Sequence, residues 1–270
     1  MKKLIYKYYK INTFLYDVLI SNQLYFASFK QFNDPYDCYM TFFEKVTEGD
    51  FKVYLAGLKL NEEIEQKYLK AFNRKPDEFV KPFIDAYKGW INHYGICCFT
   101  KGKENILLWS HYADSHKGVC LGFDYDLMIK RFPQYDDVEY SSEPFYFDLK
   151  NSETSVAKTI LRKSIDWKYE NEVRFVIERS KTIDFYQDAL LEVNFGSRCP
   201  DRDKMNMQYL VSKMNYRNCQ FNNAFINEKE YKVQFDTCNL EELRKSVLEK
   251  SKEKRFEHTI DLKHLLDDSA

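Results

Sequence analysis

Residues 94–100, YGICCFT, form an almost unbroken apolar run, which constrains the fold more than any other stretch of the chain. A strand with one face in water alternates polar and apolar residues, whereas a strand covered on both faces does not. We therefore expect a central buried strand here. The segment VCLGFD at residues 119–124 predicts the next strand.

Strand and helix patterns alternate along the rest of the chain, starting with a short strand at LIYKYYK. The segment NTFLYDVLISN predicts a short helix, with Asn12 or Thr13 as its N-cap and Asn22 as its left-handed end. A further strand, QLYFAS, follows directly. Local sequence signals of this kind are typical of small α+β proteins.

The domain organisation follows from changes in composition and in secondary-structure pattern along the chain. Residues 44–93 have helical spacing and few strand signals, which indicates a helical insertion. Charged residues dominate residues 239–270, which predicts a polar helical tail. We expect one α+β domain over residues 1–238, with about eight strands.

Charge and cysteine usage exclude several classes of protein. The formal net charge of −1 provides no global field that would recruit nucleic acid or an anionic membrane. The seven cysteines include no C-x-x-C pair, so we expect reduced thiols in a cytoplasmic protein, with no metal site. No apolar run approaches the roughly 18 residues that a membrane span needs.

The segment WSHYADSHKGVCLGFD concentrates side chains that carry chemistry. His111 and His116 would diverge by roughly 140° on a regular helix, so they cannot bind one zinc ion together. His111 and Asp114 would share a helix face, and the carboxylate could orient the imidazole. In the alternative interpretation Trp109 belongs to the core, His116 lies in the last helical turn and Gly118 ends the helix in the left-handed conformation.

The segment WKYENEVRF places two carboxylates two residues apart. If both are extended, Glu170 and Glu172 lie on one face, and Arg174 continues that face. Such a carboxylate can bind a ribose hydroxyl and stabilise a cationic sugar in a transition state. Spacing alone favours the other interpretation, a solvent-exposed row of charges on a half-exposed strand.

The segment FNDPYD offers a third group of polar side chains. Asn33, Asp34 and Asp37 could lie at the mouth of a cleft, and a simple turn explains the segment about as well. Together with His111, the two aspartates would also suit a metal-dependent nuclease, which is the least favoured function.

Several segments together resemble a bacterial family, domain of unknown function 2971: LIYKYYK, LYFASFKQFNDPYD, CFT, LLWSHYADSHKGVCLGFD and WKYENEVRF. The resemblance spans roughly residues 4–237, and residues 44–93 match poorly. The order of parts is also similar to that of ADP-ribosyltransferases, with a first strand, a short helix, the LYFAS strand and a late glutamate at a strand start. Members of the family also look similar to abortive-infection proteins of phage defence.

The similarity to ADP-ribosyltransferases implies a mixed or antiparallel split sheet of about eight strands, with a cleft that binds nicotinamide adenine dinucleotide (NAD). Glu172 would be the glutamate of that class, preceded by Glu170 in an E-x-E pattern, with His111 as a further catalytic candidate. The implied ligand-binding residues are Tyr6, Lys7, Tyr8, Tyr25, Ser28, Asn33, Asp34, Trp109 and Arg174. Tyr6, Tyr25 or Trp109 would stack on nicotinamide, and His111 or Arg174 would meet the pyrophosphate.

Two functions from different classes follow. The first is an ADP-ribosyltransferase-like or NAD-glycohydrolase-like enzyme of phage defence, with NAD as substrate, no metal, no membrane partner and a protein or nucleic acid as acceptor. The second is a non-catalytic module that binds a protein or nucleic acid, through the helical insertion and the basic stretch Lys250–Arg255.

Overall fold

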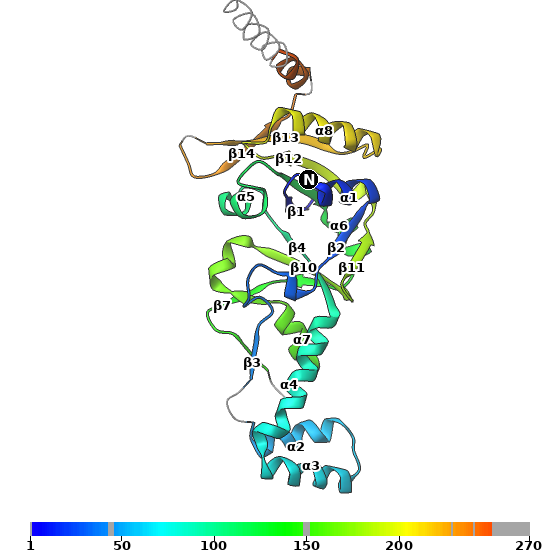
Figure 1. Cartoon of the computed structure of the whole chain (residues 1–270), viewed down its shortest axis with the longest axis vertical. Coiled ribbons are helices and arrows are strands. Elements are labelled where there is room, and N and C mark those ends of the chain that lie inside the picture. Colours follow the sequence, from blue (N-terminus) through cyan, green and yellow to red (C-terminus); the bar gives the residue numbers. More distant parts are fainter. Residues whose placement is uncertain (1, 43–45, 148–151, 228, 240, 250–270) are drawn as a thin grey trace, which may run out of the picture. The chain divides into compact units, whose positions relative to one another are not determined.

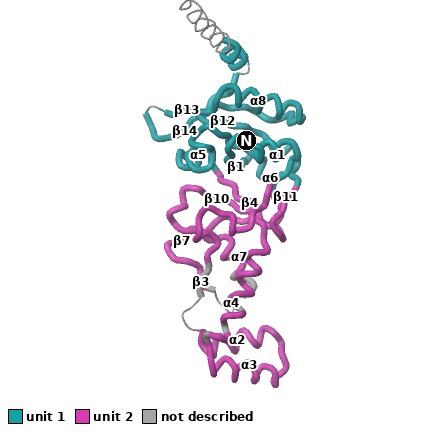
Figure 2. The backbone as a smooth tube through the Cα atoms, in the orientation of Figure 1, with its two compact units in different colours: residues 1–23, 102–128, 184–270 teal, residues 24–101, 129–183 magenta. Residues whose placement is uncertain are grey.

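A computed structural model describes residues 2–42, 46–147, 152–227, 229–239 and 241–249 (Figure 1). The chain divides into two compact units, shown in different colours in Figure 2. Unit 1 contains residues 1–23, 102–128 and 184–270, and unit 2 contains residues 24–101 and 129–183. Both units combine helices with strands, so the predicted α+β class is confirmed.

Unit 1 is built on five strands in the order β14-β13-β12-β5-β1. They are β1 (Leu4–Tyr9), β5 (Val119–Asp124), β12 (Leu190–Phe195), β13 (Gln220–Ile226) and β14 (Val233–Thr237). The β12–β13 pair is parallel and the other pairs in this order are antiparallel, so the sheet is mixed. The segment VCLGFD, predicted as a strand, is β5, and every residue in it is buried.

The helices of unit 1 include α1 (Thr13–Ser21), α5 (Ile106–Tyr112), most of α6 (Tyr125–Arg131) and α8 (Asp201–Lys213), and residues 241–249 are helical as well. Both predicted ends of α1 are confirmed. The Asn12 side chain accepts a hydrogen bond from the Leu15 amide at 3.1 Å, and Asn22 adopts the left-handed conformation with φ 54° and ψ 40°. These two residues satisfy backbone groups that a helix end leaves without partners.

The segment after α5 differs from its prediction. The helix ends at Tyr112, so His116 lies outside the helix, and the helix-face relation expected between His111 and Asp114 does not arise. Asp114, Ser115 and His116 take the left-handed conformation, and no described glycine has a positive φ. Gly118 is required for a steric reason instead, because a Cβ atom there would lie 2.1 Å from the carbonyl oxygen of Tyr9.

Unit 2 contains three antiparallel strands in the order β4-β10-β6, namely β4 (Tyr94–Thr100), β10 (Glu172–Glu178) and β6 (Tyr135–Asp137). The run YGICCFT is β4, and Ile96, Cys97 and Phe99 in it are buried, as predicted. These three strands and the five of unit 1 match the number of strands expected for the sheet.

Short two-stranded pairs complete the β-structure of unit 2. Parallel pairs join β3 (Met40–Phe42) to β8 (Phe145–Phe147) and β7 (Glu139–Ser141) to β9 (Arg162–Ser164). A further pair joins β2 (Gln23–Phe26) to β11 (Lys181–Asp184). The β7–β9 pair places Tyr140 opposite Lys163, and both residues contribute to the candidate site.

Three helices occupy the segment that the sequence assigns to a helical insertion: α2 (Glu48–Gly57), α3 (Glu62–Arg74) and α4 (Pro76–His93). Phe51 of α2 and Phe72 of α3 stack with ring centroids 4.7 Å apart in a small core of their own. The remaining helix of unit 2 that bears on the site is α7 (Ser152–Ile160). Whether residues 1–238 behave as one domain stays a prediction.

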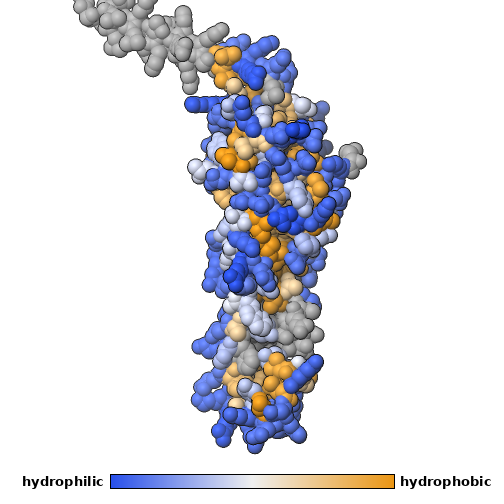
Figure 3. Space-filling model, turned by 90° about the vertical axis from the view of Figure 1, so that its right-hand side faces the viewer, coloured by the Kyte–Doolittle hydropathy of each residue, from blue (hydrophilic) through white to orange (hydrophobic). Residues whose placement is uncertain are grey.

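The surface in Figure 3 is mostly hydrophilic, with apolar residues in separate groups. No helix in the described part of the chain is both long enough and apolar enough to cross a membrane.

Candidate functional site

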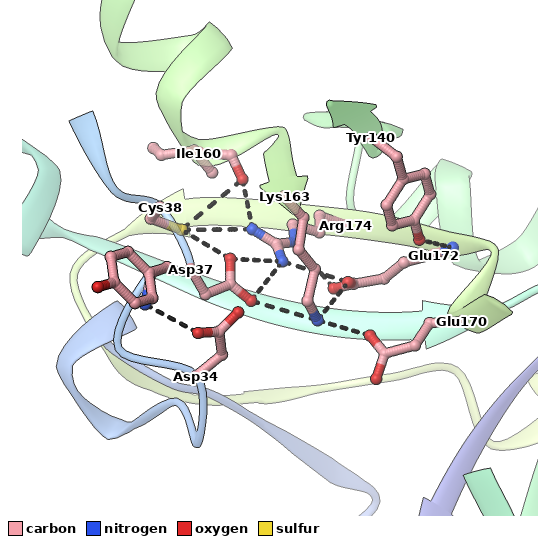
Figure 4. Close-up of polar contacts among 10 residues, drawn as sticks. Asp34, Asp37, Cys38, Tyr140, Ile160, Lys163, Glu170, Glu172 and Arg174 are labelled. Atoms are coloured by element: carbon pink, nitrogen blue, oxygen red, sulfur yellow. Dashed lines mark hydrogen bonds and ion pairs between the residues drawn. The ribbon is translucent and has the colours of Figure 1, made fainter. Parts of the chain in front are cut away.

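Unit 2 holds a buried network of five charged side chains: Asp37, Lys163, Glu170, Glu172 and Arg174 (Figure 4). Asp37 comes from a segment distant in sequence, and the other four lie within residues 163–174, on β9, the following 3₁₀ helix and β10. Every member is at most 6% exposed. Three carboxylates face two cations, so the network carries a formal charge of −1 when all five groups are ionised.

The local backbone explains why Glu170 and Glu172 both enter the network. Glu172 is the first residue of β10, whereas Glu170 is the last residue of a 3₁₀ helix over Ile165–Glu170. Asn171 between them takes the left-handed conformation with φ 44°, which asparagine tolerates better than most residues. The expectation that both glutamates lie on one extended strand is therefore wrong, and a turn brings the two carboxylates to the same lysine.

Arg174 is the most completely bonded member, with 0% exposure. Its Nε donates to Glu172 at 2.8 Å, and one terminal nitrogen donates to Asp37 at 2.8 Å and to Glu172 at 3.2 Å. The other terminal nitrogen donates to the Ile160 carbonyl at 2.6 Å and to the Cys38 sulfur at 3.3 Å. All five N–H groups of the guanidinium thus have acceptors.

Lys163 lies among the three carboxylates of the network (Figure 4). Its Nζ is 2.5 Å from a Glu170 oxygen and 3.3 Å from oxygens of both Glu172 and Asp37. The same ammonium lies 5.0 Å from the centroid of the Trp167 ring. The ammonium therefore combines ion pairs with a cation–π contact.

The charges of the network fix the protonation state of Glu172. Burial by itself would raise the pKa of this carboxyl, but the positive charges of Arg174 and Lys163 outweigh burial and lower the pKa to about 2. For Lys163, burial would lower the pKa, but the three carboxylates outweigh it and raise the pKa. Glu172 is therefore ionised at neutral pH and is a poor proton acceptor, so it can act through its charge and not as a general base.

Cys38 contacts the network but is unsuited to nucleophilic chemistry. Its sulfur lies 3.6 Å from Asp37 and accepts from Arg174, and burial raises the pKa of the thiol despite the nearby guanidinium. A neutral thiol is a weak nucleophile. We therefore regard Cys38 as a packing and hydrogen-bonding residue.

A pocket of about 280 Å³ opens beside the network, with Lys163 in its wall. Three serines and several aromatic and charged side chains line most of the rest of it. The lining residues that matter below are Asp34, Tyr36, Tyr39, Glu143, Phe145, Arg162, Lys163, Asp166 and Trp167. Because Lys163 belongs to both features, a ligand in the pocket would lie next to the network.

The structure brings together five of the residues predicted for the site. Asp37, Glu170, Glu172 and Arg174 belong to the network, and Asp34 lines the pocket. The interpretation that spacing favoured, a solvent-exposed row of charges on β10, is wrong, because Glu172 and Arg174 are buried. Their shared face, predicted from the spacing of two, is confirmed by their hydrogen bond.

Three other predicted residues of unit 2 lie on β2 or in the segment that follows it, and they are not members of the network. Tyr25 on β2 donates to the Gln31 side chain at 2.8 Å and accepts from Ser180 at 3.1 Å. Ser28 precedes a short 3₁₀ helix, and its amide donates to the same Gln31 side chain at 3.1 Å. Asn33 is exposed in the segment that leads to Asp34.

The remaining predicted residues belong to unit 1: Tyr6, Lys7 and Tyr8 on β1, and Trp109 and His111 on α5. The Trp109 ring is fully buried, packs edge-on against Tyr8 at 5.1 Å and donates through Nε1 to the Lys103 carbonyl. Its interpretation as a core residue is therefore confirmed. His111 is exposed, and the Lys7 ammonium lies 6.0 Å from the Tyr9 ring.

Two residues of the site were not predicted from the sequence. Lys163 lies at the centre of the network, and Trp167 forms part of the pocket wall. No local signal marks Lys163, because its partners lie seven and nine residues away and across the fold at Asp37. Tyr140 was also missed; its hydroxyl accepts a hydrogen bond from the Glu172 amide at 2.9 Å. Within the described residues, no group of histidine, cysteine, aspartate and glutamate side chains has the arrangement of a metal site.

Residues 108–175 match the model of a family described as a protein of unknown function (DUF2971). This match supports the resemblance to that family over a span that contains Tyr140, Lys163, Glu170, Glu172 and Arg174. No curated protein and no solved structure matches the chain significantly.

Proposed function

We propose that this chain is an ADP-ribosyltransferase-like or NAD-glycohydrolase-like enzyme that uses the negative charge of the unit 2 network. The observation that carries the proposal is the excess of carboxylates over cations: three carboxylates are buried with only two cations, and the pKa of Glu172 is about 2. A fixed, ionised carboxylate in a buried site is suited to stabilising a positive charge that develops during a reaction.

NAD cleavage develops such a charge. When the bond between the ribose carbon and the nicotinamide nitrogen breaks, both bonding electrons go to the ring, which becomes neutral nicotinamide. The ribose carbon is left cationic until water or another nucleophile adds to it and gives up a proton. A carboxylate beside the ribose lowers the energy of this cationic state, as in glycoside hydrolysis.

The hydrogen bonds of Glu172 specify its role more narrowly. Both of its oxygens already accept from Arg174 or Lys163, so the carboxylate is held rigidly and cannot turn freely toward a ligand. In the proposed mechanism, Glu172 and Glu170 therefore act by charge, and Lys163 and Arg174 position them. Trp167, Tyr36 and Tyr39 line the adjoining pocket and offer ring surfaces near this charge.

The test incubates the full chain with NAD and measures the release of nicotinamide by chromatography. Glu172→Gln removes the charge at nearly constant shape, and we expect at least a hundredfold lower kcat. The matched control is Glu178→Gln at the exposed end of the same strand, which should retain full turnover. Because Glu172 is paired in a buried network, Glu172→Gln should also lower the melting temperature, so turnover is measured well below that temperature and normalised to folded protein.

Two results would overturn the enzyme proposal. One is a wild-type protein that neither releases nicotinamide nor gives a binding heat with NAD. The other is equal turnover of Glu172→Gln and Glu178→Gln. A separate arm adds candidate protein and nucleic-acid acceptors with labelled NAD, because transfer and hydrolysis differ only in which nucleophile reaches the ribose.

A non-catalytic binding module is the second candidate, and one observation favours it: every hydrogen-bonding oxygen of Glu172 is already engaged, so the network can be wholly structural. Its proposed surface includes Lys250–Arg255, which lies outside the described residues. In a phage-protection assay, this module loses protection when residues 240–270 are deleted and keeps it in Glu172→Gln. The enzyme in a phage-defence role gives the opposite pattern.

A further inference from the structure

We propose that the pocket beside the network binds an organic cation that carries N–H donors, of the primary alkylammonium class. The pocket lies wholly within unit 2 and has a volume of about 280 Å³, which suits a small molecule or the end of a longer one. The proposal does not depend on NAD chemistry, and three independent features of the pocket support it.

The first feature is the charge balance around the pocket. Its lining includes the carboxylates of Asp34, Glu143 and Asp166 against the cations of Arg162 and Lys163. Behind Lys163, the network adds Asp37, Glu170 and Glu172 against Arg174. The region thus has six carboxylates and three cations, although the whole chain has a formal charge of only −1. A cation gains from this local excess, whereas an anionic phosphate is repelled.

The two cations in the pocket wall do not reverse this preference, because both already have partners. Lys163 is held by three carboxylates. Arg162 donates to the Ser141 hydroxyl at 2.6 Å and lies 3.6 Å from a Glu139 carboxylate oxygen. The charge of Lys163 is therefore compensated before a ligand arrives, and that of Arg162 is offset in part, with its buried Nε left without an acceptor among the described residues.

The second feature is the aromatic wall. Tyr36 and Tyr39 stand with ring centroids 5.6 Å apart and are 68% and 47% exposed, so their faces are accessible to a ligand. Trp167 and Phe145 complete the wall. Aromatic faces attract cations, and an aromatic wall beside carboxylates is the combination that recognises ammonium groups. Lys163 shows this chemistry within the same site, since its ammonium lies among carboxylates and 5.0 Å from the Trp167 ring.

The third feature distinguishes an ammonium with N–H donors from a quaternary one. One oxygen of Asp34 accepts a hydrogen bond from the Tyr36 amide at 2.9 Å. The other oxygen is buried and has no hydrogen-bond donor among the described residues. Leaving a buried carboxylate oxygen unpaired is costly, so a ligand that brings an N–H group to Asp34 would gain more than one that brings only methyl groups.

The experiment is isothermal titration of the full chain with putrescine, a diammonium ion, and with butane-1,4-diol, its neutral analogue. We expect binding of putrescine only. Asp34→Asn should weaken putrescine binding about tenfold, Asp166→Asn about threefold and Tyr36→Ala about threefold to fivefold. The matched controls, Asp236→Asn and Tyr231→Ala, change exposed residues of unit 1 and should bind like the wild type.

Absence of putrescine binding, or equal binding of the diol, would overturn the proposal. So would controls that lose as much affinity as the pocket variants. A further experiment titrates the protein with magnesium and calcium ions. The proposal fails, and the pocket is a metal site, if two results occur together: these ions bind more tightly than putrescine, and Tyr36→Ala changes neither the affinity for the ions nor the affinity for putrescine. Melting temperatures confirm that each variant is folded, and Asp166→Asn, at an exposed position, keeps the test valid if Asp34→Asn is unstable.

Discussion

Each unit of this protein places a lysine ammonium beside a carboxylate and near an aromatic ring, but the two arrangements differ in charge. In unit 1, Lys103 lies 2.6 Å from Glu192 and 4.6 Å from the Phe235 ring centroid, and the amide oxygen of Asn194 accepts from it at 2.9 Å. One cation there meets one carboxylate, and the remaining partners are neutral amides. In unit 2, two cations meet three carboxylates and are more deeply buried.

The difference suggests different purposes. A balanced pair completed by amides satisfies its own hydrogen bonds and needs nothing further, which is the pattern of a structural polar cluster. A network with more negative than positive charge costs more to bury and retains a field that can act on another molecule. We therefore assign function to the network of unit 2 and a structural role to the Lys103 pair.

The largest expected effect comes from removing one cation from each cluster. Arg174→Met leaves buried carboxylates without their main partner and should lower the free energy of unfolding by about 3–5 kcal/mol. Lys103→Met should cost only about 1–2 kcal/mol, because Lys103 and Glu192 retain some contact with water and neutral amides remain. Urea denaturation measures both. Equal losses would mean that the two clusters do not differ in the way described.

Lowering the pH should remove part of the stability that the network gives the folded protein. The pKa of Glu172 is about 2 in the folded protein, below its ordinary value of 4.5, so the unfolded chain takes up the proton first as the pH falls. Its stabilising contribution is complete above about pH 4.5 and is lost between about pH 4.5 and 2, with a magnitude on the order of 3 kcal/mol. Comparing the urea unfolding midpoints of the wild type and of Glu172→Gln across this pH range isolates the contribution of Glu172 to stability. Parallel curves for the two proteins would contradict the assignment.

The smallest expected effect concerns the rings. Trp167→Leu in unit 2 and Phe235→Leu in unit 1 each remove an aromatic face near a lysine ammonium. Each should lower stability by about 1 kcal/mol, a similar amount in both units. Only Trp167→Leu should also weaken putrescine binding in the titration described above, because only Trp167 lines the pocket. Loss of putrescine binding in both variants would argue against a local effect.

Local signals allowed part of this structure to be predicted. Asn12 and Asn22 define both ends of α1 because capping depends on residues within one turn. The shared face of Glu172 and Arg174 follows from the period of two in a strand. Both predictions need only neighbours in the sequence.

Other features depended on contacts that no local pattern contains. The charges on β10 suggested exposure to solvent, yet Arg174 is buried because Asp37, 137 positions earlier, and the Ile160 carbonyl accept its hydrogen bonds. Lys163 could not be predicted from the sequence for the same reason. The path of residues 114–116 was also missed, because three successive non-glycine residues in the left-handed conformation contradict local preference and depend on their surroundings.

The wide sequence separation of the bonds to Arg174 also bears on how unit 2 acquires its structure. An arginine whose acceptors come from Asp37, Cys38, Ile160 and Glu172 cannot have all of its N–H groups bonded until the first and last segments of the unit meet, although Glu172 lies beside it in sequence. Closing so long a loop is slow because of its entropic cost, and any half-assembled form would leave charges without partners. The guanidinium thereby penalises incomplete assembly, so unit 2 should form in a single cooperative step.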